Sequence, residues 1–253
     1  MGAITLRGVT GKSIDLAPTG EWHLSIEESG IAGLVGEEKV SADSAVGLPG
    51  EVANGSSIPA MTGDLTITVV ADAHRSADLL AADLRRELDF WEPARLMMIN
   101  PRGKMRSCDV VLNGPLDPPR AFGAQWLEIR VPLKAKAGVW DLTPTVATGA
   151  VTVTNIGDTY LWPEIEWKGS PKLTLPSNTQ ITLPYAASHR RLSLSPWTSH
   201  EVTDLDGVID HALSDLTEML HLGEGVPRRA SRPYSITSGG TIITTCQILD
   251  PWK

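Results

Sequence analysis

The sequence has 253 residues, a length typical of two domains that each bury a core of their own. Hydrophobic residues make up 42% and charged residues 21%, which is the composition of a folded chain rather than a disordered one. The formal net charge of −8 argues against a dedicated DNA-binding or membrane-surface protein, because phosphate contacts require clustered cations. No run approaches about 18 apolar residues and the first residues lack a signal pattern, so we expect neither a membrane span nor a signal peptide.

The first 26 residues predict short, half-buried strands, because side chains of a strand point to opposite faces in turn. The alternating apolar positions are Ile4 and Leu6, then Ile14 and Leu16, then Trp22, Leu24 and Ile26. Gly8, Gly11 and Pro18-Thr19-Gly20 mark the turns between these strands.

The segment from Gly30 to Gly63 is rich in Gly, Ser and Ala and carries little large apolar area. A structureless loop of this length is uncommon inside a compact domain and usually has a function. We therefore expect an extended loop or β-hairpin arm that becomes ordered against a neighbouring subunit, with a plain surface loop as the alternative.

A strand is predicted at Leu65 to Ala71, followed by the clearest helix of the chain, His74 to Trp91. The helix carries one apolar stripe at helical spacing, formed by Ala77, Leu80, Leu84, Leu88 and Trp91. Further strands are predicted at 96–99, 104–112 and 125–132. The small, polar, Pro-containing segment 134–148 is predicted to hold the domain boundary, which gives domains of residues 1–145 and 146–253.

The second half predicts several short strands separated by turns, which is typical of a β-sandwich. Its apolar pairs are Val151 and Val153, Ile165 and Trp167, Leu173 and Leu175 opposite Ile181 and Leu183, and Leu192 and Leu194 continuing to Trp197. A helix is predicted between Val208 and Leu222, with Gly223 as its C-terminal cap. Its apolar face consists of Val208, Ala212, Leu216, Met219 and Leu220. The last residues, 241–252, are predicted to add strands that close the second sheet.

Motifs that carry chemistry are absent from the sequence. There is no nucleophile elbow, no Walker loop and no dinucleotide-binding glycine motif, and the six histidines form no H-E-x-x-H. Cys108 and Cys246 form no C-x-x-C pair, and Thr203 to Gly207 departs from a calcium loop, so we expect free thiols and a turn. Glu164 and Glu166 share one strand face at about 7 Å, as an inverting glycosidase pair would, but no sugar cleft accompanies them. We expect no catalytic, metal or cofactor residues, and hence no enzyme.

Several motifs, taken in order, resemble the distal tail proteins of long-tailed bacteriophages. The second half carries Asn155-Ile156-Gly157-Asp158, then Pro163, then an alternating strand from Glu164 to Gly169. Later come Val226-Pro227 and Asp250-Pro251-Trp252. The first half shows an opening strand-turn-strand, Gly30-Ile31-Ala32-Gly33-Leu34, a Gly/Ser-rich arm, a strand, a helix and more strands. The resemblance implies a mainly β fold: a split β-barrel or sandwich with one helix, as in tail-tube proteins, and then a galectin-like β-sandwich.

The resemblance also implies a structural role in the virion. Distal tail proteins form a ring, usually a hexamer, at the tail tip. One face meets the tail tube and the other meets the tail-associated hub and the fibre or receptor-binding proteins, while DNA and the tape-measure protein pass through the centre. The protein would then be assembled in the host cytoplasm and would do no chemistry.

Two other functions stay open. In a carbohydrate- or receptor-binding module, exposed Trp162, Trp167 or Trp197 would stack on sugar rings, although the His-x-Asn-x-Arg and Trp-x-x-Glu strands of sugar-binding galectins are missing. Another tail-tip or tail-tube component of similar fold would have nearly the same sequence features.

Overall fold

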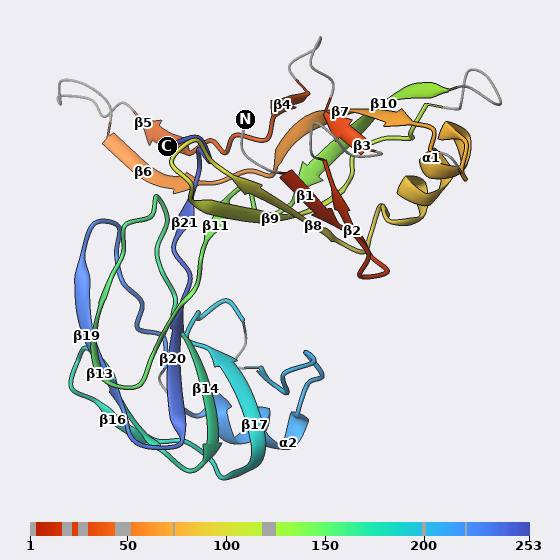
Figure 1. The fold of residues 1–253 in the computed structure, drawn as a ribbon. Helices are drawn as coiled ribbons and strands as arrows, with labels where there is room; N and C mark the ends of the chain where they lie inside the picture. The colour runs from red at the N-terminus through yellow and green to blue at the C-terminus, as the bar shows by residue number, and fades with distance from the viewer. Residues whose placement is uncertain are drawn as a thin grey trace. The chain divides into compact units, whose positions relative to one another are not determined.

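The structure is a computed structural model that describes residues 4–16, 22–24, 30–43, 52–72, 74–117, 125–198, 201–220 and 222–253. It divides into two compact units (Figure 1). The first comprises Met1–Trp140 together with Ile248–Lys253, and the second comprises Asp141–Gln247. The sequence did not predict that the last six residues of the chain return to the first unit.

The described residues form many antiparallel strands and two helices, so the prediction of a mainly β protein is confirmed. In the first unit the sheet order is β2-β1-β8-β9-β10-β7-β3, with β4 also paired to β7. These strands are β1 (Ile4–Arg7), β2 (Ser13–Asp15), β3 (Trp22–Leu24), β4 (Ile31–Gly33), β7 (Met61–Val70), β8 (Ala94–Ile99), β9 (Met105–Leu112) and β10 (Trp126–Ala135). A separate pair consists of β5 (Lys39–Asp43) and β6 (Val52–Ser57).

The core of the first unit follows from alternation along its longest strands. On β7 the side chains of Leu65, Ile67 and Val69 are fully buried, whereas Val70 is exposed. The antiparallel register places Ile129 of β10 opposite Ile67. Paired apolar residues on one face of a sheet are the unit of its stabilisation, so the period-two pattern fixes which face becomes core.

The first helix is shorter than the range His74 to Trp91 that the apolar pattern predicts. Helix α1 spans Ala77–Arg86, begins at Ser76, whose hydroxyl accepts from the backbone N–H of Leu79, and packs against β7 and β10. Four of the five predicted stripe residues are buried, but Trp91 is 81% exposed and lies beyond the helix end. Asp89 explains the end, because its carboxylate accepts the backbone N–H groups of Trp91 and Glu92 in a turn.

The segment 134–148, in which the domain boundary is predicted, contains regular strands. It contains the end of β10, β11 (Trp140–Leu142) and β12 (Thr145–Ala147). Trp140 is fully buried, and its indole N–H donates to the backbone carbonyl of Leu34 at 2.7 Å. A single large side chain thus supplies the apolar area that the rest of the segment lacks.

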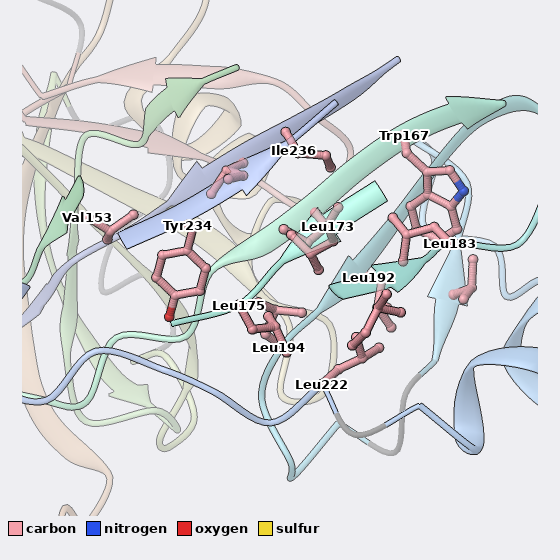
Figure 2. Close-up of a cluster of buried hydrophobic side chains, with 14 of the residues drawn as sticks. Val153, Trp167, Leu173, Leu175, Leu183, Leu192, Leu194, Leu222, Tyr234 and Ile236 are labelled. Atoms are coloured by element: carbon pink, nitrogen blue, oxygen red, sulfur yellow. The ribbon is translucent and has the colours of Figure 1, made fainter. Parts of the chain in front are cut away.

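The second unit is a sandwich of two antiparallel sheets, of order β12-β20-β14-β17-β18 and β13-β19-β15-β16. Its remaining elements are β13 (Gly149–Thr154), β14 (Glu164–Gly169), β15 (Lys172–Thr174), β16 (Gln180–Thr182), β17 (Ala186–Ser193), β18 (Val202–Thr203), α2 (His211–Glu218), β19 (Ser231–Ile236) and β20 (Gly240–Thr244). The last strand, β21 (Gln247–Ile248), pairs with β11 and belongs to neither sheet of the sandwich. Figure 2 shows the core between the sheets, where Trp167, Leu173, Leu192 and Tyr234 point inward.

The predicted hairpin and alternating strand of the second unit are confirmed. Leu173 pairs with Ile181 in the β15–β16 hairpin, and Ile165 and Trp167 on β14 are fully buried. One detail of the prediction was wrong, because Trp197 does not continue the buried alternation and is 83% exposed. The end of the chain supplies strand β20, which lies inside its sheet, between β12 and β14.

Four of the five residues of the second helix's predicted apolar face are exposed, and the fifth, Leu220, is partly buried. Helix α2 ends at Met219 rather than near Gly223, and Thr217 is its buried residue, with Leu213 and Leu220 partly buried against the core. Val208 is 65% exposed, Leu216 60% and Met219 83%. The pattern predicted a helix correctly but assigned its buried side wrongly, because two apolar stripes run along the same short helix.

Candidate assembly surfaces

The predicted arm is a β-hairpin within the described residues, and it is shorter than Gly30 to Gly63. Strands β5 and β6 pair antiparallel from Lys39↔Ser57 to Asp43↔Val52 and pair with no other described strand. The residues of β5 up to Ala42 and those of β6 from Gly55 are exposed. Residues 44–51, where the connection lies, are outside the described residues. The hairpin therefore presents unpaired strand edges, which are available for pairing with another chain.

The base of the arm is fixed to the sheet. Leu34 is fully buried, its backbone N–H donates to Thr62 at 2.9 Å, and its carbonyl accepts from Trp140. Both Gly33 and Leu34 have positive φ angles, of 70° and 53°. A positive φ is unfavourable for leucine by about 1–2 kcal/mol, and these contacts hold the residue there. The segment thus has a rigid base and an exposed hairpin.

A groove of about 570 Å³ lies beside this base, between β4, β7 and β10. At its wall, a Cβ on Gly63 would come within 2.3 Å of the carbonyl oxygen of Ala32, so only glycine allows β4 and β7 to approach this closely. Arg130 and Asp64 form an ion pair of 2.7 Å in its lining. The described lining residues include no serine, cysteine, histidine or lysine, so the groove offers none of the usual pairs of nucleophile and base.

The Asn155-Ile156-Gly157-Asp158 motif is a buried structural turn. The side-chain amide of Asn155 donates to the carbonyl oxygens of Thr159 and Val226, at 2.8 and 2.9 Å, and its Oδ1 accepts the N–H of Gly157. A Cβ on Gly157 would lie 2.4 Å from the carbonyl oxygen of Gln247. The motif thus packs against the chain at Val226 and at Gln247, both distant in sequence. The sequence did not indicate this structural role.

The carboxylates of Glu164 and Glu166 are taken up by ion pairs. Glu166 lies 3.1 Å from Arg191 Nη2 and 3.1 Å from His189 Nδ1, and Glu164 lies 3.9 Å from Arg191 Nε. One arginine therefore faces both carboxylates across the β14–β17 pair. Both carboxylates are thus engaged by side chains of β17 rather than facing an open cleft.

The tryptophans that were candidates for sugar binding lie in three different environments. Trp167 is fully buried and donates from its indole to the carbonyl of Pro184, so it is unable to stack on a ligand. Trp162 stacks on Tyr160 with ring centroids 4.6 Å apart. Trp197 is 83% exposed. His200 and His221 lie outside the described residues.

Two titratable groups of the second unit have a shifted pKa. Side-chain hydrogen bonding to Arg190 and the backbone N–H of Leu213 lower the pKa of Asp210 below its usual value. Burial raises the pKa of Tyr234, whose hydroxyl donates to the carbonyl of Glu224. Among the described residues there is no cluster of three His, Cys, Asp or Glu that could hold a metal ion, and no described helix is long and apolar enough to cross a membrane.

The chain folds into two mainly β units. Solved structures share this fold over nearly the whole chain. The Dit protein of SPP1, a paradigm of the hub adsorption apparatus in Gram-positive infecting phages, matches with a TM-score of 0.60 and 13% identity, covering 96% of this chain and 98% of that one. A chain of the phage P2 baseplate in its activated conformation with Ca matches with a TM-score of 0.55 and 8% identity, over 97% and 98%. The same baseplate with Sr gives 0.53 and 8%, over 96% and 98%. No family model and no curated protein matches the sequence.

Proposed function

We propose that this protein is a structural component of a phage tail tip, of the distal tail type, and is not an enzyme. The observation that carries the proposal is the shared fold: both units, in their order, match a Dit hub protein over 96% of the chain. The order of motifs in the sequence supports the same role.

In this role the first domain, residues 1–145, forms a closed ring, usually a hexamer, at the tip of the tail. The second, residues 146–253, is a galectin-like sandwich that docks other proteins. The partners are the tail tube protein, the hub protein, and the fibre or receptor-binding proteins. The tape-measure protein and DNA pass through the centre. The protein resides in the virion and is assembled in the host cytoplasm.

The arm supports the ring because it has the features of a subunit connector. Its base is fixed by Leu34 and Trp140, whereas its β5–β6 strands are exposed and lack a partner sheet among the described residues. Such a hairpin gains buried area and backbone hydrogen bonds only from another chain. In a closed cycle every copy gives and receives the same contact.

Native mass spectrometry and negative-stain microscopy of the purified full chain test the proposal. We expect closed rings of one defined order at high protein concentration, and the same ring at the tail tip of virions that contain the protein. A chain that stays monomeric at every concentration and is absent from purified virions would overturn it.

A glycan-binding module is the second candidate, and the exposure of Trp197 favours it. Exposed indole rings stack on sugars, and Trp197 is the only one of the three candidate tryptophans that is largely free to do so. A glycan array with the full chain and with Trp197→Ala separates the two functions. Binding that Trp197→Ala abolishes, in a protein that still forms rings, supports this second function, and an array without binding rejects it.

A further inference from the structure

The exposed side of helix α2 is both apolar and acidic. The α2 face consists of Asp215, Leu216 and Glu218 on α2, Met219 at its C-cap, and Val208, which precedes the helix; all five residues are exposed. Asp215 and Met219 lie on the side of the helix opposite the partly buried Leu213 and Leu220, whereas Leu216 lies at the edge of that side, next to Leu220. Such a face costs solvation free energy when it stays in water, so it is typical of an interaction surface.

The chain segment that contains α2 carries charged side chains of one sign only. Residues 201–224 contain no lysine or arginine and have acidic side chains at Glu201, Asp204, Asp206, Asp210, Asp215, Glu218 and Glu224. Asp210 is paired with Arg190, whereas Asp206, Asp215 and Glu218 form no ion pair with any described residue. A surface that covers the α2 face must therefore be basic as well as apolar.

The first unit carries a surface of this kind at the tip of the β8–β9 hairpin. The basic tip consists of Ile99, Arg102, Lys104 and Met105, all exposed. Ile99 pairs directly with Met105, so their side chains lie side by side on one face. Residues 95–106 include four cations and no acidic residue.

The turn that presents the two cations is rigid. Asn100 Oδ1 accepts the backbone N–H groups of Arg102 and Lys104, at 3.0 and 2.9 Å. Neither cation forms an ion pair with a described residue, so both charges are available to a partner. Their side chains take no part in the turn, and they can be replaced without disturbing it.

We propose that the α2 face of one copy of this chain binds the basic tip of a second copy. Val208, Leu216 and Met219 cover Ile99 and Met105, while Asp215 and Glu218 pair with Arg102 and Lys104. The inference rests on the proposed assembly into rings, and it adds a head-to-tail contact, distinct from the β5–β6 arm. Head-to-tail contacts between unlike surfaces are those that generate closed rings.

Charge reversal with mixing tests this contact. In the variant Arg102→Glu with Lys104→Glu, the tip becomes acidic like the α2 face. In the variant Asp215→Lys with Glu218→Lys, the α2 face becomes basic like the tip. Sedimentation velocity over a range of protein concentrations measures self-association. We expect each variant alone to associate at least about tenfold more weakly than the unmodified protein, and an equimolar mixture to recover it. The association of the unmodified protein should also weaken as salt rises from about 0.05 to 0.5 M.

The matched control is Lys168→Glu with Lys172→Glu, which has the same net charge as the first variant but changes exposed lysines of the second unit. It should associate normally, and it should not rescue the basic variant. If neither reversal weakens association, or if the control rescues as well, the contact is overturned. If shortening the arm abolishes rings while the reversals do nothing, the proposed function stands and this contact alone is rejected. A protein that never associates rejects both.

Discussion

The side-chain amide of Asn155 donates a hydrogen bond of 2.9 Å to the carbonyl oxygen of Val226, 71 residues later in the chain. The same two segments are tied by the backbone bridge between Leu161 and Val226. The Asn-Ile-Gly-Asp and Val-Pro motifs, which stand far apart in the sequence, are therefore two sides of one buried junction. Their spacing in the sequence reflects this packing rather than a ligand.

Replacement of Asn155 by alanine should destabilise the second unit. The change removes the partner of the Thr159 and Val226 carbonyls and of the Gly157 N–H. Asn155 is only 1% exposed, so these groups lose the partner in a buried place. Each unsatisfied buried group costs about 1–3 kcal/mol, so we expect a loss of roughly 2–5 kcal/mol in urea unfolding. Asn113→Ala, at an exposed asparagine, is the control and should have little effect. Equal stability of the two variants would contradict the assigned role.

Trp140→Phe should weaken the base of the arm. Phenylalanine keeps most of the apolar volume but removes the donor for the buried carbonyl of Leu34. We expect a loss of about 1–3 kcal/mol in the free energy of unfolding and faster amide exchange at Leu34. The matched substitution Trp126→Phe, at a tryptophan that is 63% exposed, should be nearly silent. An unchanged exchange rate at Leu34 would show that the indole does not hold the base.

Shortening the arm should abolish rings and spare the fold. Lys39 pairs with Ser57, so an Asn-Gly turn can join these positions and remove residues 40–56 while β4 and β7 stay intact. Circular dichroism and the melting temperature should stay close to those of the full chain, while native mass spectrometry should show monomers. Rings of unchanged order in this variant would leave the hairpin without a role in assembly.

The Asp210–Arg190 contact should make stability depend on pH in acid. The pKa of Asp210 is lowered in the folded protein, mainly by the hydrogen bond from Arg190. Its stabilisation is therefore present above the ordinary aspartate pKa and is lost as pH falls through the lower folded value. Asp210→Asn keeps an N-cap at α2 but removes the charge, so its melting temperature should fall less between about pH 5 and 3 than that of the unmodified protein. Parallel curves for the two proteins would argue against this contribution.

The sequence by itself determined the mainly β class and most strands, because a strand's two faces impose a period of two that any buried face reveals. Ile165 and Trp167, which alternate with Glu164 and Glu166, needed no structure to be assigned to one face. It also indicated that 30–63 was unusual, because glycine and serine bury too little area to fold alone. The absence of motifs for catalysis was likewise readable from the residues.

Only the tertiary structure decided which of two apolar stripes on α2 became core, since periodicity shows that a face exists but not which neighbour covers it. The same holds for Trp91 and Trp197, whose hydrophobicity predicted burial but which lie beyond the ends of their elements. Asn155 shows the converse: an ordinary polar residue became buried because carbonyls distant in sequence converged on its amide. Long-range packing of this kind depends on where separate segments meet, and that is a property of the folded chain rather than of any local pattern.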